Sequence, residues 1–399
     1  MKWIETEKFS DTYILIRTLL PLNKETITRL NLLVYMMRAK TEKYDTKQKL
    51  SMVMNSTYGM NISYGLTGYG KQVSFDVRFK YIRQDYIDKE GYVNQVIDIM
   101  NQIVNHPILD DSTLKEAKYL LKSKLMSQMD DPDSIAIKHA LEKAQPNHEI
   151  GIQIQGYVED IDCVTLEQMQ DLYVCWTKHS KVVYACGHAC QSVEEFLSGL
   201  DGKVQFENDS TLIQSQLPAY TIESKDISQA SLVQVYATHI SLQDDLYYPL
   251  LVMNSMLGQC PMNLLFEEIR EKNSYCYSIS SNLIRFDGAL VLMAGTNKEN
   301  IEDVQRLMGV QLERLQKGDV DASLMMIAKS DLIDMVRLQQ DRAASMIEQS
   351  FLDDLLHKKE SSEEKIRKIE SVTLEQVQKV ASLLSLVSVS IVEENRDEL

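Results

Sequence analysis

Arg270 and Tyr277, seven residues apart, have the side chains of this sequence best suited to act on a peptide. A planar guanidinium binds carbonyl or carboxylate oxygens, and a phenol hydroxyl donates to an oxyanion as it develops. We therefore interpret the pair as groups that bind a peptide backbone and assist its chemistry. The residues alone also allow structural roles, because the helix dipole favours an arginine at a helix C-terminus and tyrosine is common in half-buried strands.

A helix followed by a strand is expected to hold both side chains. Apolar residues recur with the spacing of one helical stripe at Met262, Leu265, Phe266 and Ile269. Asn273 is expected to end this helix, because asparagine tolerates the left-handed conformation that follows a last helical turn. The β-prone residues 275–279 come next. The prediction thus places Arg270 in the last helical turn and Tyr277 at the start of a strand, with both directed into one cleft.

A second candidate group consists of Cys186, His188 and Cys190. If the alternation of the preceding strand continued, the two thiols and the imidazole would share one side of it and form a metal-binding face. No fourth ligand is evident, and the run KVVYAC equally fits a buried strand that ends at Gly187. The residues leave both interpretations open.

The composition is that of a globular protein outside the nucleic-acid-binding and membrane-spanning classes. Hydrophobic residues make up 44% of the chain, and its net charge of −16 would repel phosphates. No apolar run reaches the ~18 residues of a membrane span. The opening residues carry acids where a secretion signal needs bases, and the six cysteines lack regular spacing. We expect a cytoplasmic protein that binds neither nucleic acid nor a membrane.

Two short segments of the sequence recur about 200 residues later. Residues 164–170, VTLEQMQ, return as residues 372–378, VTLEQVQ, after 208 positions. Residues 122–125 return as residues 329–332 after 207 positions. Two echoes at nearly one offset indicate a duplication of about 200 residues rather than a short-period repeat. We predict domains at 1–200 and 220–399, joined by a polar linker at 201–219.

The two halves contain the same order of predicted elements. Each has a strand, a helix, a β-hairpin, two long helices, a capped helix and a last strand. In the first half these elements fall, in that order, at 13–20, 26–39, 58–81, 92–106, 114–129, a helix opened by Thr165, and 181–186. In the second half they fall at 232–240, 245–257, 275–295, 301–316, 323–338, a helix opened by Thr373, and 386–392. In both capped helices a glutamine follows the threonine by three positions, which predicts a capping box. This grouping predicts an α+β fold of duplicated halves, each an antiparallel sheet packed with helices.

The duplication and the segment FEEIREKNSYCYS resemble the insulinase/pitrilysin-type zinc peptidases, in particular their smaller two-chain or dimeric class. The second half of those proteins carries a motif close to F-x-E-I/L-R-E-x-x-x-x-x-Y-S. This sequence matches it at Phe266, Glu268, Ile269, Arg270, Glu271, Tyr277 and Ser278. The resemblance covers nearly the whole chain, and it implies paired α+β domains that form one half of a clamshell around a peptide.

The resemblance also implies a zinc site in the first half, at a His-x-x-Glu-His motif with a later Glu ligand. This sequence departs from that pattern. Aligned positions fall on Asn31, Val34 and Tyr35, and the later ligand falls on Lys124 or, one residue earlier, Ser123. Val34 cannot act as a base, and a lysine is repelled by a dication. We therefore expect no metal in this chain.

For this chain the resemblance implies the non-zinc subunit of a bacterial heterodimer. A homologous partner subunit holds the zinc in such pairs, and Arg270 and Tyr277 would act in trans on a peptide substrate bound there. Some bacterial members are associated with maturation of ribosomally made peptides and others with modification of a translation elongation factor. The residues do not select between these roles.

Two other classes of function stay open at the level of sequence. The chain could be a peptide-binding or scaffold subunit that stabilises its partner without taking part in chemistry. It could also be a metal-dependent enzyme of a different design that uses Cys186, His188 and Cys190.

Overall fold

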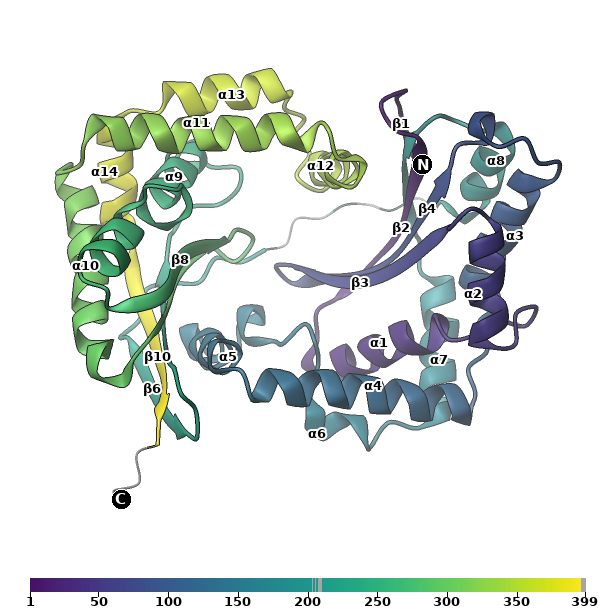
Figure 1. Cartoon of the computed structure of the whole chain (residues 1–399), viewed down its shortest axis with the longest axis horizontal. Helices are drawn as coiled ribbons and strands as arrows, with labels where there is room; N and C mark the ends of the chain where they lie inside the picture. The colour runs from purple at the N-terminus through teal and green to yellow at the C-terminus, as the bar shows by residue number, and fades with distance from the viewer. Residues whose placement is uncertain (203, 205, 207–209, 396–399) are drawn as a thin grey trace. The chain divides into compact units, whose positions relative to one another are not determined.

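The structure is a computed structural model that describes residues 1–202, 204, 206 and 210–395; positions 203, 205 and 207–209 of the predicted linker lie outside the described residues. The chain forms two compact units, each built on a five-stranded sheet (Figure 1). Unit 1 consists of Met1–Met126, Gln153–Asn208 and Gln339–Lys359, and unit 2 of Ser127–Ile152, Asp209–Leu338 and Glu360–Leu399. The predicted domains at 1–200 and 220–399 follow the duplication, whereas each compact unit also takes in a segment of the other half.

The two sheets have the same topology. Unit 1 contains β1 (Lys2–Glu5), β2 (Asp11–Pro21), β3 (Asn61–Tyr69), β4 (Gln72–Ile82) and β5 (Val182–Gly187), in the order β1-β5-β2-β4-β3. Unit 2 contains β6 (Ala219–Lys225), β7 (Ala230–Ala237), β8 (Cys276–Ile284), β9 (Ala289–Thr296) and β10 (Ser385–Glu394), in the order β6-β10-β7-β9-β8. The predicted α+β class with duplicated halves is confirmed. The clamshell that the resemblance implies stays a prediction.

The sheets differ from the prediction in one respect, because neither of them is wholly antiparallel. β1 pairs in parallel with β5, and β6 pairs in parallel with β10, while the other neighbouring strands are antiparallel. Each parallel pair joins the first strand of a half to its last strand. Pairing between strands so far apart in the chain leaves no turn signal in the sequence.

The helices repeat between the halves in the same way. The first half contributes α1 (Lys24–Met37), α2 (Lys47–Ser56), α3 (Tyr92–Asn105), α4 (Asp111–Met129), α5 (Pro132–Ala144), α6 (Val158–Ile161), α7 (Leu166–Lys178) and α8 (Gln191–Leu200). The second contributes α9 (Tyr247–Asn254), α10 (Ile301–Lys317), α11 (Ala322–Gln339), α12 (Ala343–Leu355), α13 (Ser362–Ser371) and α14 (Leu374–Leu383), with π-helical turns η3 (Ser255–Gln259) and η4 (Phe266–Lys272). Both predicted capping boxes, at Thr165 and Thr373, are confirmed. None of the described helices combines the length and the apolar composition that a membrane crossing needs.

Each unit is completed by one helix from the other half of the sequence. α5 packs in unit 2 against β7 and β10, and α12 packs in unit 1 against β5 and β2. The buried side of α5 joins an apolar cluster on the sheet, made by Ile135, Ala136, Ala140, Ala144, Val233, Val235 and Val291. The small alanine side chains let the helix approach the sheet closely. The two halves therefore exchange one helix each.

A buried ion pair anchors α12 to the sheet of unit 1. Arg17 on β2 and Asp76 on β4 are cross-strand partners, and Arg17 donates from Nε and Nη2 to the two carboxylate oxygens at 2.7 and 2.8 Å. Nη2 also donates to Glu348 of α12 at 3.0 Å, and the guanidinium carbon lies 4.1 Å from the ring centre of Phe351. Arg17 and Asp76 are only 1% and 0% exposed, so both charges depend on this pairing.

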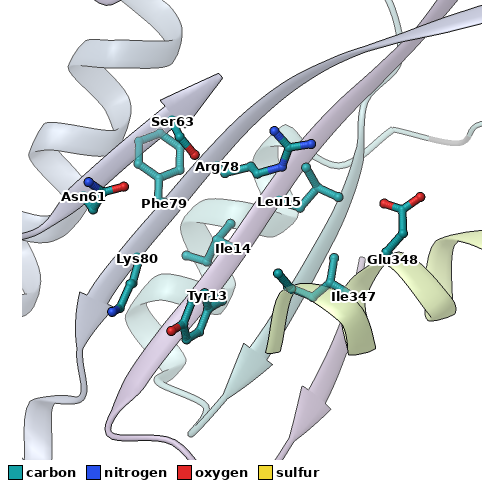
Figure 2. Close-up of a pocket in the computed structure, with 11 residues that line it drawn as sticks. Tyr13, Ile14, Leu15, Asn61, Ser63, Arg78, Phe79, Lys80, Ile347 and Glu348 are labelled. Atoms are coloured by element: carbon teal, nitrogen blue, oxygen red, sulfur yellow. The ribbon is translucent and has the colours of Figure 1, made fainter. Parts of the chain in front are cut away.

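A pocket of about 190 Å³ lies between α12 and this sheet (Figure 2). Its apolar walls include Ile14, Phe79 and Ile347. The cationic groups at its border, Arg78 and Lys80, already pair with Asp76 and Asp11. We therefore attribute the pocket to the packing of helix on sheet rather than to ligand binding.

In unit 2 a buried carboxylate faces the segment that follows α5. Asp287, in the β8–β9 turn, is buried, and its Oδ1 has no hydrogen-bond partner among the described residues. Burial raises the pKa of Asp287 to about 6; His148, with Nδ1 at 3.8 Å from Oδ1, opposes the rise, and Glu149 adds to it. The His148 ring is held by the backbone, since Nδ1 accepts from the Ile150 amide and Nε2 lies 2.8 Å from the Thr211 oxygen. The ionised form of Asp287 is thus disfavoured in the folded chain.

Replacing Asp287 by Asn is expected to stabilise the chain at pH 8 and to have little effect near pH 4. The folded pKa of about 6 lies above the ordinary value of 3.8, so the folded state retains the proton longer and the native chain loses stability as pH rises through this interval. That difference corresponds to about 3 kcal/mol as an upper value. Calorimetric unfolding at both pH values measures it, with the exposed Asp319→Asn as control. A gain of equal size at both pH values would contradict the assignment.

Candidate functional site

Arg270 lies on an exposed part of unit 2, in the π-helical turn η4. The helix before it buries Leu265 and Ile269, whereas the predicted stripe fails at Met262, which is 49% exposed. The difference arises because the helix begins after Asn263, whose Oδ1 accepts from the Phe266 amide at 2.8 Å and so caps it.

The guanidinium of Arg270 lies over an aromatic ring at the surface. Its central carbon is 5.0 Å from the ring centre of Phe266, a distance suited to a cation–π contact. The backbone oxygen of Arg270 accepts from the Ser274 amide at 3.1 Å. The π-helical turn and this backbone hydrogen bond hold the main chain of Arg270 in place, and its side-chain N–H groups remain at the surface.

The helix ends where the sequence predicted, but a different residue takes the left-handed conformation. Asn273 has φ −103°, and Ser274 has φ +54°. The Asn273 side chain instead donates from Nδ2 to the Glu268 carbonyl at 2.6 Å. Asn273 therefore ends the helix through a hydrogen bond from its side-chain amide, and the left-handed conformation falls on the next residue, Ser274.

Tyr277 occupies a β-bulge at the beginning of β8. Cys276 is opposite Thr296 and Ser278 is opposite Gly295, so Tyr277 has no partner across the sheet. The bulge interrupts the alternation of sides: Cys276 is buried, while Tyr277 and Ser278 both face outward. Tyr277 is 59% exposed, and its hydroxyl donates to Oδ1 of Asn297 at 3.0 Å. The bulge thus directs a phenol away from the core and Asn297 orients its hydroxyl.

Arg270 and Tyr277 therefore lie on consecutive elements of unit 2, η4 and β8, and both side chains are exposed. Their contacts differ, because the guanidinium stacks on Phe266 and the phenol bonds to Asn297. This arrangement offers a cation and a neutral donor to a ligand from outside. The expectation that both point into one cleft stays a prediction.

The positions aligned with the zinc motif have side chains that do not fit zinc. Asn31 on α1 is buried, and its Nδ2 donates to the carbonyls of Ile27 at 3.0 Å and Ile154 at 2.8 Å. Val34 is apolar, and Tyr35 lies beneath the guanidinium of Arg38, at 4.5 Å from ring centre to carbon. The side-chain amide of Asn31 thus bonds to two backbone carbonyls, and the position of the first histidine of the zinc motif has no metal-binding nitrogen.

The positions on α4 do not supply a ligand either. Ser123 and Lys124 are both exposed, and an ammonium group is repelled by a dication. The aligned positions on α1 and α4 therefore do not supply the ligands that the zinc motif requires.

The candidate metal face of Cys186, His188 and Cys190 is not formed. Cys186 is buried in β5, where burial raises the pKa of its thiol to about 11, and Cys190 lies beside the Gln84 side chain. Their ligand atoms do not fall within 4.8 Å of one another in the described structure. The alternation stops at Gly187, which has φ +130°, so His188 turns outward while Cys186 faces the core.

His188 instead meets two carboxylates that the sequence did not associate with it. Glu5 and Glu7 lie beside it because β1 pairs in parallel with β5. His188 was a candidate ligand in the sequence, but its partners depend on a pairing across more than 180 residues. No local signal predicts such a contact.

Comparison with known proteins places the chain among peptidase-like proteins. A family model described as the peptidase M16 inactive domain matches residues 182–332. The probable inactive metalloprotease YmfF of Bacillus subtilis (strain 168) is 22% identical over 395 residues, covering 96% of this chain and 93% of YmfF. The uncharacterized zinc protease YmxG of the same organism is 21% identical over 303 residues, covering 74% and 73%.

Solved structures share the whole fold. A conserved protein from Enterococcus faecalis V583 has a TM-score of 0.90 at 23% identity, covering 100% of this chain and 96% of that protein. A peptidase M16 inactive domain from Pseudomonas fluorescens has a TM-score of 0.80 at 14% identity, with coverage of 100% and 96%. The resemblance to the insulinase/pitrilysin-type peptidases is confirmed, and residues 182–332 of the chain match the peptidase M16 inactive domain.

Proposed function

We propose that this chain is the non-zinc subunit of a heterodimeric M16 metallopeptidase. In this proposal a homologous partner holds the zinc, Arg270 orients the peptide backbone, and Tyr277 stabilises the oxyanion of the tetrahedral intermediate. One observation carries it: the zinc-motif positions hold Asn31, Val34 and Tyr35, while the side chains of Arg270 and Tyr277 are exposed. The chain has kept groups that assist hydrolysis and lacks those that bind the metal.

The environment of Tyr277 supports a role as a donor to an external oxygen. The bulge directs its side chain outward, and among the described residues its hydroxyl donates one hydrogen bond, to Asn297, that a stronger acceptor can replace. An oxyanion is such an acceptor, because hydrogen bonds to charged oxygens are roughly twice as strong as neutral ones. A preorganised donor of this kind acts mainly on the transition state.

The position of β8 supports binding of an extended peptide. β8 is the last strand in its sheet, and among the described strands it pairs with β9 alone, so its outer edge has no strand partner. Edge strands bind peptides by adding them to the sheet through main-chain hydrogen bonds. A peptide placed along β8 passes Tyr277 at its bulge and reaches the end of η4, where Arg270 is exposed.

A second candidate function is a peptide-binding or scaffold subunit without a part in chemistry. The contacts of Arg270 with Phe266 and of Tyr277 with Asn297 favour it, since both side chains already have partners within the chain. In that case the double variant Arg270→Ala, Tyr277→Phe would leave the activity of the complex unchanged, while omission of the chain would abolish it.

The cytoplasmic location is also part of the proposal. All six cysteines are free, and Cys163 and Cys175 are exposed thiols. Free exposed thiols persist in reducing compartments and are oxidised elsewhere. These thiols support a cytoplasmic location.

Reconstitution with an M16 chain that carries His-x-x-Glu-His tests the proposal. We expect the two chains to co-elute in size-exclusion chromatography and to cleave peptides only as a mixture, with activity lost on chelation. A zinc-bearing chain that reaches full activity alone, or that forms no complex with this chain at equimolar concentration, would contradict it.

A further inference from the structure

Unit 1 contains a cavity of about 560 Å³ that the proposed function does not use. Tyr81, Arg83, His188 and Cys190 are among the residues that line it. Tyr81 is 2% exposed; its hydroxyl interacts with the Thr12 side chain but makes no hydrogen bond of regular geometry among the described residues. A buried hydroxyl without a well-formed hydrogen bond normally bonds to water or to a ligand. The cavity therefore has room and a polar group for a guest.

Three exposed ligating groups converge at His188, which lines this cavity. One side-chain donor atom each of Glu5, Glu7 and His188 lies within 4.8 Å of the other two. His188 Nδ1 is 3.3 Å from Glu5 Oε1 and 3.0 Å from Glu7 Oε1. Two atoms that each lie about 2.1 Å from a tetrahedral zinc are about 3.4 Å apart. The imidazole-to-carboxylate separations thus match those of ligands around one ion.

The backbone fixes this convergence. Glu5 is opposite Gly187 in the parallel β1–β5 pair, and Gly187 has φ +130°. A Cβ at that glycine would lie 3.0 Å from the Asp11 carbonyl oxygen, so a larger residue fits neither the conformation nor the space. The turn at Gly187 brings His188 out beside the end of β1. Glu5 is the last residue of β1, and Glu7 and His188 lie just beyond the ends of the two paired strands.

Further contacts orient both carboxylates. Glu5 accepts from the Ala189 amide at 3.0 Å, and Glu7 pairs with Arg83 at 2.5 Å. The hydrogen bond from Arg83, with a smaller effect of His188, holds the pKa of Glu7 below its usual range. Such secondary contacts are typical of metal ligands, whose orientation they set. Arg83 also pairs with Asp85, so the surroundings of the two carboxylates remain negative overall.

We propose that Glu5, Glu7 and His188 form a binding site for a divalent transition-metal ion such as zinc. The ion takes the place of the proton on His188 Nδ1 and receives one oxygen from each glutamate. Because His188 lines the cavity, water or a small oxygen ligand can complete the coordination of the ion from that side. This site is separate from the zinc-motif positions on α1, and it does not depend on a partner subunit.

Calorimetric titration of the isolated full-length chain with zinc chloride tests the site. The background variant Cys163→Ser, Cys175→Ser removes the exposed thiols, which bind zinc by themselves. We expect one equivalent to bind with an enthalpy change, and His188→Ala and Glu7→Gln each to weaken binding by tenfold or more. His106→Ala is the matched control, since His106 is exposed but has a single carboxylate neighbour, Glu42 at 3.2 Å.

The imidazole signals of His188 give a second readout. In ¹H–¹⁵N spectra zinc is expected to shift the Nδ1 resonance of His188 and to leave that of His106 in place. Equal affinity in the His188→Ala and His106→Ala variants, or a titration of the background variant without heat or spectral change, would overturn the proposal. Peptidase activity enters neither measurement, so this result is independent of the proposed function.

Discussion

Replacing Asp76 by Asn is expected to lower the free energy of unfolding by about 3–5 kcal/mol, the range for removing one partner of a buried ion pair. The change leaves the Arg17 guanidinium without the carboxylate that accepts two of its hydrogen bonds, in a site where it is 1% exposed. Glu348 is too exposed, at 38%, to compensate for that charge alone. Denaturant unfolding followed by tryptophan fluorescence measures the loss, because Trp3 and Trp176, the two tryptophans of the chain, both belong to unit 1.

The matched control is Asp341→Asn, which breaks the exposed pair with Lys8 in the same unit. Exposed pairs contribute about 0–1 kcal/mol, so this variant should unfold almost as the native chain does. The double variant Arg17→Met, Asp76→Leu should lose less than the two single variants predict together, since it removes both buried charges. Equal effects of Asp76→Asn and Asp341→Asn would show that the buried pair does not hold α12 in place.

Tyr277→Phe is expected to reduce kcat of the reconstituted peptidase by about two to three decades, with little change in KM. Loss of one oxyanion donor typically raises the barrier by about 2.7–4 kcal/mol, and the phenyl ring keeps the packing of the tyrosine. Within the described part of the chain the hydroxyl bonds only to Asn297, at the surface, so its removal should not unfold the chain. Initial rates with a fluorogenic peptide, at saturating and at low concentration, separate the two parameters.

Tyr220→Phe is the control for this variant. Tyr220 is exposed to a similar degree, 62% against 59%, and lies on β6 at the other edge of the same sheet. It should leave kcat unchanged. If the complex forms and Tyr277→Phe turns over peptide at the native rate, Tyr277 has no part in the chemistry and the scaffold function is favoured.

The elements that the sequence predicted are those with local signals. The capping boxes at Thr165 and Thr373 open helices as expected, because both of their hydrogen bonds join residues three positions apart. The predicted hairpins and long helices agree with β3–β4, β8–β9, α3, α4, α10 and α11. The duplication further fixed the correspondence between the halves, since the same order of elements occurs twice.

The features that escaped prediction depend on contacts between distant residues. α5 and α12 each pack on the sheet of the other half, where their apolar side chains are buried. Neither helix contains a local sequence feature that predicts which sheet it packs against. The parallel pairs β1–β5 and β6–β10 also join strands that are far apart in the sequence. Glu5 and Glu7 contact His188 because β1 pairs with β5. Without knowledge of that pairing, the sequence analysis associated His188 with the nearby cysteines instead.

The candidate site was predictable in its residues and less so in its geometry. The order of helix, stop and strand around Arg270 and Tyr277 agrees with the structure. The bulge that exposes Tyr277 follows from the register with β9, and the left-handed turn at Ser274 rather than Asn273 follows from a side-chain bond to Glu268. Both details depend on packing that a single strand or helix does not encode.

The most direct measurement of the central claim is peptide hydrolysis by the isolated chain in the presence of zinc. The His188→Ala variant is the appropriate form, because it removes the surface site and leaves the α1 positions intact. The account predicts no chelator-sensitive cleavage by this chain alone and full cleavage once a zinc-bearing partner is added. Chelator-sensitive cleavage by the isolated chain, abolished by Asn31→Ala, would contradict it.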